Sequence, residues 1–457
     1  MTPSIALAGL ALAGKPPPPP DLDAVAAGLL GAALASDEAY RELAALCDGI
    51  GHRVTGSAAL DRAIDWGLAE MTADGLSTRR EPVTVPIWAR NEARATLLGS
   101  PARDLPILAL GRSGATPAGG IDAEVVVVGS FDEYKALPDA AVAGKIVVWD
   151  VPFTDYGATV AYRWAGAIEG AKRGAVASLV RSVTPESLST PHTGVMGVEE
   201  GKAPLPAAAL TVEDSMTLRR LAAAGPTRVH LEINAREMPD GQSANAIGER
   251  LGRELPEEIV VLGCHLDSWD VGQGAQDDGA GCVMVMEAAA LLAALPVAPR
   301  RTVRVVLFTN EESGGAGGKA YQAAHAGERH VGVLEADTGA GAPLGFRVDV
   351  GADDRPDLEG LARLQRWLEP LGAGRLEPGG AGADVGPLVA AGSAGLGLIN
   401  EMSGYWRIHH THADTFDKVE PAALRFNTAA VALAAWWLAE GDPIGRLPGA
   451  VPGVEPP

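Results

Sequence analysis

Apolar runs of strand length alternate with helical segments throughout the chain after residue 240. The expected strands cover residues 257–265, 302–310, 330–337 and 394–401. The expected helices between and after them cover residues 281–295, 317–327, 356–371 and 424–440. Apolar strands that alternate with helices are typical of a mainly parallel sheet with helices on both faces. The sequence therefore predicts an α/β fold of this kind.

A segment with a different composition and a different pattern of predicted strands and helices precedes this region. Before it, helices are expected at residues 36–50 and 57–75 and strands within 83–99. From about residue 101, short strands mix with one or two helices, and proline and glycine cluster between them. A chain of 457 residues also exceeds one ordinary core. We therefore expect, in chain order, a leader and proline-rich spacer (1–22), the first part of a main domain (23–100), a smaller inserted β/α domain (101–236), the second part of the main domain (237–443) and a tail (444–457).

The first residues, MTPSIALAGLALAG, are small and apolar, and prolines fill positions 16–20. The apolar run resembles the core of a secretory signal and is too short to span a bilayer, although no basic segment precedes it. Cys47, Cys264 and Cys282 form no disulfide framework and are expected to pack as small apolar side chains. We expect an exported protein, periplasmic or extracellular, without a membrane span.

The net charge of −21 bears on which partners the chain can bind. Proteins that bind nucleic acid neutralise phosphates with basic patches, and no basic stripe is visible here. Nucleic acid is therefore excluded as an expected partner, while an acidic chain is compatible with cation binding.

Polar side chains follow the expected strands of the main domain, and others lie in loops between them. In open α/β sheets, ligands bind beyond the carboxyl ends of the strands, so these side chains are expected to meet at one edge. Five of them combine two imidazoles with three carboxylates, and they are His265, Asp277, Glu312, Asp337 and His410. Such a set suits two divalent cations that share one bridging carboxylate. Mixed nitrogen and oxygen ligands favour zinc, with cobalt or manganese as alternatives.

Two further acids accompany this set. Asp267 is placed to orient His265 by contacting this ligand, without binding the metal itself. Glu311 directly precedes Glu312 at a strand end, where both side chains can approach one cavity, one to hold a cation and the other to move a proton. Taken singly, these motifs are ordinary turns, helix caps or solvated pairs; their joint placement favours the metal site.

The order of these motifs resembles the co-catalytic di-zinc aminopeptidase family, and in finer detail its carboxypeptidase Q subgroup. RSVTPESLSTPHTG (181–194), GQSANAIGE (241–249) and HHTHADTFDKVEP (409–421) carry the finer likeness, which covers roughly residues 36–440. The inserted segment resembles a protease-associated domain. The resemblance implies a zinc-dependent exopeptidase that hydrolyses terminal peptide bonds of small peptides, dipeptides especially, and that forms a homodimer with PHTG (191–194) near the contact.

The resemblance also implies roles for single residues. His265 and Asp337 would hold one zinc, Glu312 and His410 the other, and Asp277 would bridge them, with a cis peptide after it. Glu311 would be the general base. Many relatives have a tyrosine before the last histidine that helps to hold the oxyanion. His409 stands there instead and is the candidate for this role, ahead of Tyr405.

Four residues are candidates for binding the substrate. Asp384 would hold a free amino group or cap a helix. Arg181 and His192, in the inserted domain, would reach over the site, and Arg181 suits a carboxylate. Tyr405 is the fourth. Two rival functions on the same fold are a glutaminyl cyclase, which uses one zinc, and a binding protein like the transferrin receptor. A complete ligand set for two ions disfavours both.

Overall fold

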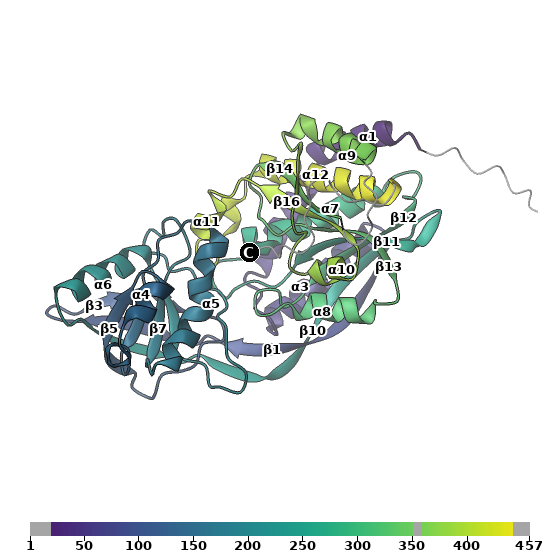
Figure 1. Cartoon of the computed structure of the whole chain (residues 1–457). Coiled ribbons are helices and arrows are strands. Elements are labelled where there is room, and N and C mark those ends of the chain that lie inside the picture. Colours follow the sequence, from purple (N-terminus) through teal and green to yellow (C-terminus); the bar gives the residue numbers. More distant parts are fainter. Residues whose placement is uncertain (1–19, 351–357, 442–457) are drawn as a thin grey trace, which may run out of the picture.

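Two eight-stranded sheets organise residues 20–350 and 358–441, the residues that this computed structural model describes (Figure 1). The first sheet has the strand order β1-β10-β12-β11-β13-β16-β14-β15. Its strands are β1 (Ser77–Ala89), β10 (Arg236–Arg250), β11 (Leu255–His265), β12 (Arg301–Phe308), β13 (Arg329–Glu335), β14 (Pro343–Asp349), β15 (Arg375–Pro378) and β16 (Ala394–Asn400). The four central strands, β12, β11, β13 and β16, run parallel, and antiparallel strands flank them.

Helices cover both faces of this sheet, as the apolar strands predict. One face carries α1 (Leu22–Ala35), α2 (Glu38–Gly49), α3 (Ala58–Ala73), α7 (Ala280–Ala293), α9 (Leu358–Leu368) and α12 (Pro421–Glu440). The other face carries α8 (Ala316–Ala324) and α10 (Gly386–Ala390). Side chains of successive strand residues point to opposite faces, so Leu262 joins the first layer and Val261 the second.

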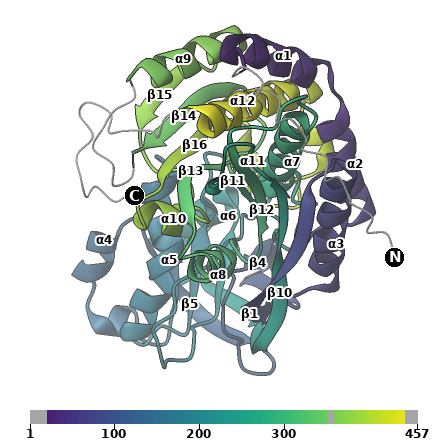
Figure 2. The same cartoon turned by 90° about the vertical axis from the view of Figure 1, so that its right-hand side faces the viewer.

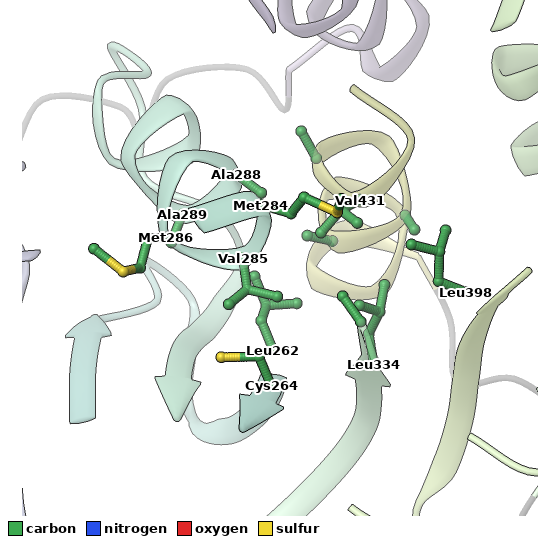
Figure 3. Packing of buried hydrophobic residues seen from close by; sticks show 14 of the residues in the cluster. Leu262, Cys264, Met284, Val285, Met286, Ala288, Ala289, Leu334, Leu398 and Val431 are labelled. Carbon is green, nitrogen blue, oxygen red and sulfur yellow. The ribbon is translucent and has the colours of Figure 1, made fainter. Parts of the chain in front are cut away.

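The core of the first sheet lies between its central strands and the helices α7 and α12. Figure 3 shows Val285 of α7 and Val431 of α12 lying over Leu262 and Leu334 of the strands beneath them. Both helices are apolar nearly all round, as expected for helices inside a core. Of the described residues, only α12 is long and apolar enough to cross a membrane, and 78% of its most apolar window is buried inside the fold.

The predicted α/β fold is confirmed, and its boundaries moved by only a few residues at most elements. Ser57 caps α3 at the start of the expected helix 57–75, because its Oγ accepts a hydrogen bond from the main-chain N–H of Leu60 at 3.1 Å. In the first sheet, the strands β10, β14 and β15 were not predicted. The strand β15 is a short edge strand beside β14, and glycine and proline interrupt the apolar pattern around both.

The second sheet has the order β3-β2-β9-β5-β6-β7-β8-β4 and draws all its strands from residues 93–233, which we call the second-sheet unit. Its strands are β2 (Ala93–Leu98), β3 (Arg103–Leu105), β4 (Ile107–Ala109), β5 (Ile121–Val128), β6 (Ile146–Trp149), β7 (Ala177–Arg181), β8 (Ala207–Leu210) and β9 (Arg228–Ile233). Its helices are α4 (Phe131–Ala136), α5 (Tyr156–Lys172) and α6 (Val212–Ala224). The predicted domain limits at residues 101 and 236 stay a prediction.

The paired strands β1 and β10 form a long antiparallel ribbon that connects the two units (Figures 1 and 2). In Figure 1 the second-sheet unit lies beside the first sheet, and α5 faces α11 (Tyr405–Ile408) across the junction. The predicted leader, most of the proline-rich spacer and the tail lie outside the described residues.

A buried acid in the helical layer gives a first testable prediction. Glu42 of α2 is 6% exposed, and burial, with Asp74 and Glu287 nearby, raises its pKa from 4.5 to about 9. The folded state therefore keeps a proton that the unfolded chain releases above pH 4.5. The stability that this proton provides is complete below about pH 4.5 and is lost as the pH rises towards about 9.

Glu42→Gln, which keeps the shape and removes the titration, should raise the free energy of unfolding at pH 8 by on the order of 1–3 kcal/mol. At pH 4 the variant and the original chain should be equally stable. Urea unfolding between pH 4 and 9 measures this, with Glu359→Gln on the exposed side of α9 as the matched control. Equal stability of all three proteins at pH 8 would show that the folded protein does not keep Glu42 protonated at the expense of stability.

Candidate active site

The predicted ligands come from separate elements of the first sheet and meet at the carboxyl ends of its parallel strands. His265 is the last residue of β11, and Asp337 follows the end of β13 by two residues. Glu312 lies in the turn after β12, and Asp277 lies in the turn Ala275–Gly279 before α7. His410 follows α11 and has a left-handed backbone conformation, with φ of 61°. The peptide bond between Asp277 and Asp278 is cis, as the family resemblance implied.

Asp277 lies at the centre of this group. Its Oδ1 is 3.2 Å from Nε2 of His265, and the same nitrogen is 3.4 Å from Oδ1 of Asp337. Its Oδ2 is 3.0 Å from Nε2 of His410, which is 3.1 Å from Oε2 of Glu312. Asp277 therefore presents one carboxylate oxygen to each of two histidine–carboxylate pairs.

The charges at this site fit a bound divalent cation. Burial, with other carboxylates nearby, raises the pKa of Glu311, Glu312 and Asp337 above their ordinary values. Oε1 of Glu312 is buried and has no hydrogen-bond partner among the described residues. A cluster of buried acids around two imidazoles with an unpaired oxygen is what zinc ligands offer before an ion neutralises them. The donor atoms therefore fit zinc.

The two histidines are oriented by main-chain carbonyl groups. Nδ1 of His265 lies 2.9 Å from the carbonyl oxygen of Asp267, and Nδ1 of His410 lies 3.2 Å from that of Thr193. A hydrogen bond at Nδ1 leaves Nε2 free to bind a metal. The expected partner of His265 was the Asp267 carboxylate, but its oxygen is 4.0 Å away.

The Asp267 carboxylate instead holds the turn after β12. It accepts hydrogen bonds from the main-chain N–H of Glu311 at 3.0 Å and from the hydroxyl of Thr55 at 2.9 Å. This contact fixes the backbone of the residue proposed as the base. Asp267 thus contacts the ends of two strands: its main-chain carbonyl binds His265 at the end of β11, and its carboxylate binds Glu311 after β12.

Two residues that sequence reasoning missed shape the loop between His265 and Asp277. Arg53 is fully buried and donates to the carbonyl oxygens of Leu266, Gln273 and Gly274 at 2.7–2.8 Å. Asp414 accepts from the main-chain N–H groups of residues 275, 276 and 277 at 2.7–3.2 Å. Burial raises the pKa of Asp414 to about 7 despite these donors. The motif HTHADT contains Asp414 and could have pointed to its role. No sequence motif marks Arg53.

His409, the candidate for holding the oxyanion, lies beside the ligand set. Its ring stacks on that of His410 with centroids 3.5 Å apart, and its Nε2 is 3.4 Å from Oδ2 of Asp277. Burial, together with His410 and Arg163, lowers the pKa of His409 well below its ordinary value. The imidazole is therefore neutral and can donate an N–H group.

The candidate substrate residues are placed unequally. Tyr405 is buried with its ring 5.0 Å from that of His409, and burial beside Asp277 raises the pKa of its hydroxyl well above the ordinary value. His192 is buried, and burial next to His410 lowers its pKa to about 3. Arg181 is directed elsewhere, because its Nη1 lies 3.2 Å from Oδ1 of Asp150 within the second-sheet unit.

Asp384 is 2% exposed, and neither of its carboxylate oxygens has a hydrogen-bond partner among the described residues. The alternative that it caps a helix is wrong, because α10 follows Val385 and has no side-chain cap. Residues 191–194 (PHTG), which the resemblance places near a dimer contact, are buried inside the chain, and the dimer stays a prediction. Cys264 and Cys282 pack in the core behind the site, as predicted.

Comparisons with known proteins show which proteins this chain is similar to. A model of peptidase family M28 matches residues 245–435, the range that holds all five ligand candidates. Carboxypeptidase Q of Mus musculus is 39% identical over 410 residues, which are 89% of this chain and 86% of that protein. Carboxypeptidase Q of Homo sapiens is 38% identical over 410 residues, with the same two shares.

Solved structures give the same result. The peptidase M28 precursor of Shewanella amazonensis SB2B has a TM-score of 0.87 and 34% identity, covering 93% of this chain and 98% of that one. A zinc aminopeptidase of Bacillus subtilis shares the fold, with a TM-score of 0.66, 21% identity, and coverage of 88% of this chain and 95% of that one. The chain therefore belongs to peptidase family M28, as a zinc-dependent exopeptidase related to carboxypeptidase Q.

Proposed function

We propose that the chain cleaves terminal peptide bonds of small peptides, dipeptides especially, at a centre of two zinc ions with Glu311 as the base. The observation that carries the proposal is the position of Asp277, whose two carboxylate oxygens face two separate histidine–carboxylate pairs. A single ion would leave one of these pairs without a role.

In this proposal His265 and Asp337 hold one zinc, Glu312 and His410 hold the other, and Asp277 bridges them. When bound, zinc acts as a Lewis acid that polarises the scissile carbonyl group and makes the attacking water more acidic. Cobalt or manganese could replace it, since the donors are nitrogen and oxygen only.

Glu311 lies next to the ligand set without belonging to it. Its main-chain N–H is held by Asp267, and the charges that act on its carboxylate include those of His265, Asp337 and Glu312, all members of the ligand set. We assign it the transfer of the attacking water's proton to the leaving amine, a contribution of ~10²–10⁴-fold to the rate.

His409 takes the place of an oxyanion donor. As a neutral imidazole it offers an N–H group to the negative oxygen that develops when the carbonyl carbon becomes tetrahedral. The burial that keeps His409 neutral is thus part of the mechanism, and Tyr405 beside it remains the second candidate.

A panel of dipeptides tests the function and the terminus that is recognised. We expect the zinc-loaded protein to cleave a free dipeptide and a chelator to stop cleavage. Blocking the recognised end, by acetylation or by amidation, should reduce kcat/KM at least tenfold, while blocking the other end should have little effect. If acetylation is the damaging change, Asp384 remains the candidate for binding the free amino group.

The controls separate the proposal from its rivals. A protein that cyclises N-terminal glutamine but leaves every dipeptide intact would be a cyclase, and one that binds no zinc and cleaves nothing would favour a binding protein. Export through residues 1–22, a homodimer, and a protease-associated role for residues 101–236 are further parts of the proposal that rest on the resemblance alone.

A further inference from the structure

We infer that the second-sheet unit completes the metal centre, because its residue Thr193 fixes the orientation of His410. The inference rests on the proposed two-zinc function. It adds a set of positioning residues, Thr193 and Arg90, that act on a ligand without touching metal or substrate.

Two hydrogen bonds join Thr193 and His410 in both directions. The main-chain N–H of Thr193 donates to the carbonyl oxygen of His410 at 3.0 Å. Nδ1 of His410 lies 3.2 Å from the carbonyl oxygen of Thr193. The first bond holds the backbone of His410, and the second holds its ring with Nε2 directed at Asp277 and Glu312.

The backbone of His410 needs such support. Its φ of 61° is in the left-handed region, which side chains other than glycine seldom adopt without compensating contacts. His265, in contrast, receives its Nδ1 partner from Asp267 in its own loop. His265 is therefore positioned by its own loop, and His410 by a residue of the second-sheet unit.

Thr193 is itself held by two arginines. Its carbonyl oxygen accepts a hydrogen bond from Nη1 of Arg163 at 3.1 Å. Its hydroxyl donates to the carbonyl oxygen of Ala109 at 3.0 Å and accepts from Nη1 of Arg90 at 2.9 Å. All three side chains are buried, so water does not compete for these bonds.

Arg90, which directly follows β1, connects Thr193 to the loop after β11. Its guanidinium group binds Asp270 through Nε and Nη2, with distances of 2.8 and 2.6 Å to Oδ1. Asp270 follows the loop that carries His265 and Asp267. A path of contacts therefore leads from the His265 loop through Arg90 and Thr193 to His410, and Thr193 is the member of this path that the second-sheet unit supplies.

Thr193→Val tests the inference, because valine keeps the shape and removes only the hydroxyl. The variant keeps the main-chain groups that bind His410 but loses the hydroxyl that anchors them to Ala109 and Arg90. We therefore expect the zinc affinity of the His410–Glu312 position to fall by about tenfold, the lower end of the usual cost of disturbing an outer partner, and the affinity of the other position to stay unchanged. Thr193→Ser retains the hydroxyl and should bind zinc within about twofold of the original chain. Competition with a zinc chelator measures both affinities.

Thr302→Val is the matched control. Thr302 is buried at the start of β12, far along the strand from the site, and its hydroxyl also makes two hydrogen bonds, with Pro256 and Gly252. It should lower the melting temperature and leave zinc affinity unchanged. If Thr193→Val does the same, Thr193 has only a structural role and the inference is wrong.

Arg90→Lys decides the matter if Thr193→Val does not fold. Lysine keeps the charge but cannot bind Asp270 and Thr193 together. We therefore expect the zinc affinity of the His410–Glu312 position to fall severalfold. Unchanged zinc affinity in the folded Arg90→Lys protein would overturn the inference. If the original chain binds a single zinc ion, the two-ion proposal fails. The inference about Thr193 is then supported only if Thr193→Val lowers the affinity for that single ion.

Discussion

Glu311→Gln should lower kcat by ~10²–10⁴-fold or more while two zinc ions stay bound. Glutamine has the same shape and keeps the main-chain contact with Asp267, which does not involve the side chain. It cannot accept a proton, so only the transfer from water to the leaving amine is lost. Dipeptide hydrolysis and zinc content, measured on the same sample, check both parts of this prediction.

Glu312→Gln is the informative comparison, since it changes the neighbouring residue by the same atom. Its carboxylate lies 3.1 Å from Nε2 of His410, so this variant should lose zinc affinity first and activity as a consequence. Adding excess zinc should then restore part of the activity of Glu312→Gln and none of that of Glu311→Gln. Equal zinc loss in the two variants would contradict the proposed separation of roles.

The sequence predicted the ligand group because each member is tied to a local pattern. His265 ends an apolar strand, Asp277 stands in a glycine-rich turn before a helix, and parallel strands bring such ends to one edge. To predict that these residues converge, only the direction of each strand and the approximate position of its end had to be predicted correctly. Errors of two or three residues in the boundaries, as at β13, left the ligands in place.

The supporting contacts could not be predicted, because most of them are made by the main chain. The carbonyl groups of Asp267 and Thr193 that orient the two histidines have no residue type that marks them. Arg181 was predicted to reach over the site, and only the tertiary structure shows that it binds Asp150 and that Arg163 is the arginine that reaches Thr193. The role of Asp384 as a cap failed because α10 starts two residues later.

Asp277→Ala should remove both zinc ions at a concentration that saturates the original chain, whereas His265→Ala and His410→Ala should each remove one. The reason is geometric: Asp277 has one oxygen 3.2 Å from His265 and the other 3.0 Å from His410, so its loss opens both positions. Since losing even an outer partner costs about 10–100-fold in affinity, losing a direct ligand should cost more than 100-fold at each position.

Equilibrium dialysis followed by elemental analysis counts the ions, and Asp240→Ala, on an exposed part of β10, controls for general effects of removing an acid. The two single-histidine variants make the count decisive, because they show what the loss of one position looks like. If Asp277→Ala retains one tightly held zinc, both oxygens of Asp277 serve the same ion. The two histidine–carboxylate pairs would then be independent sites, and catalysis would have to be assigned to the pair that lies closer to Glu311.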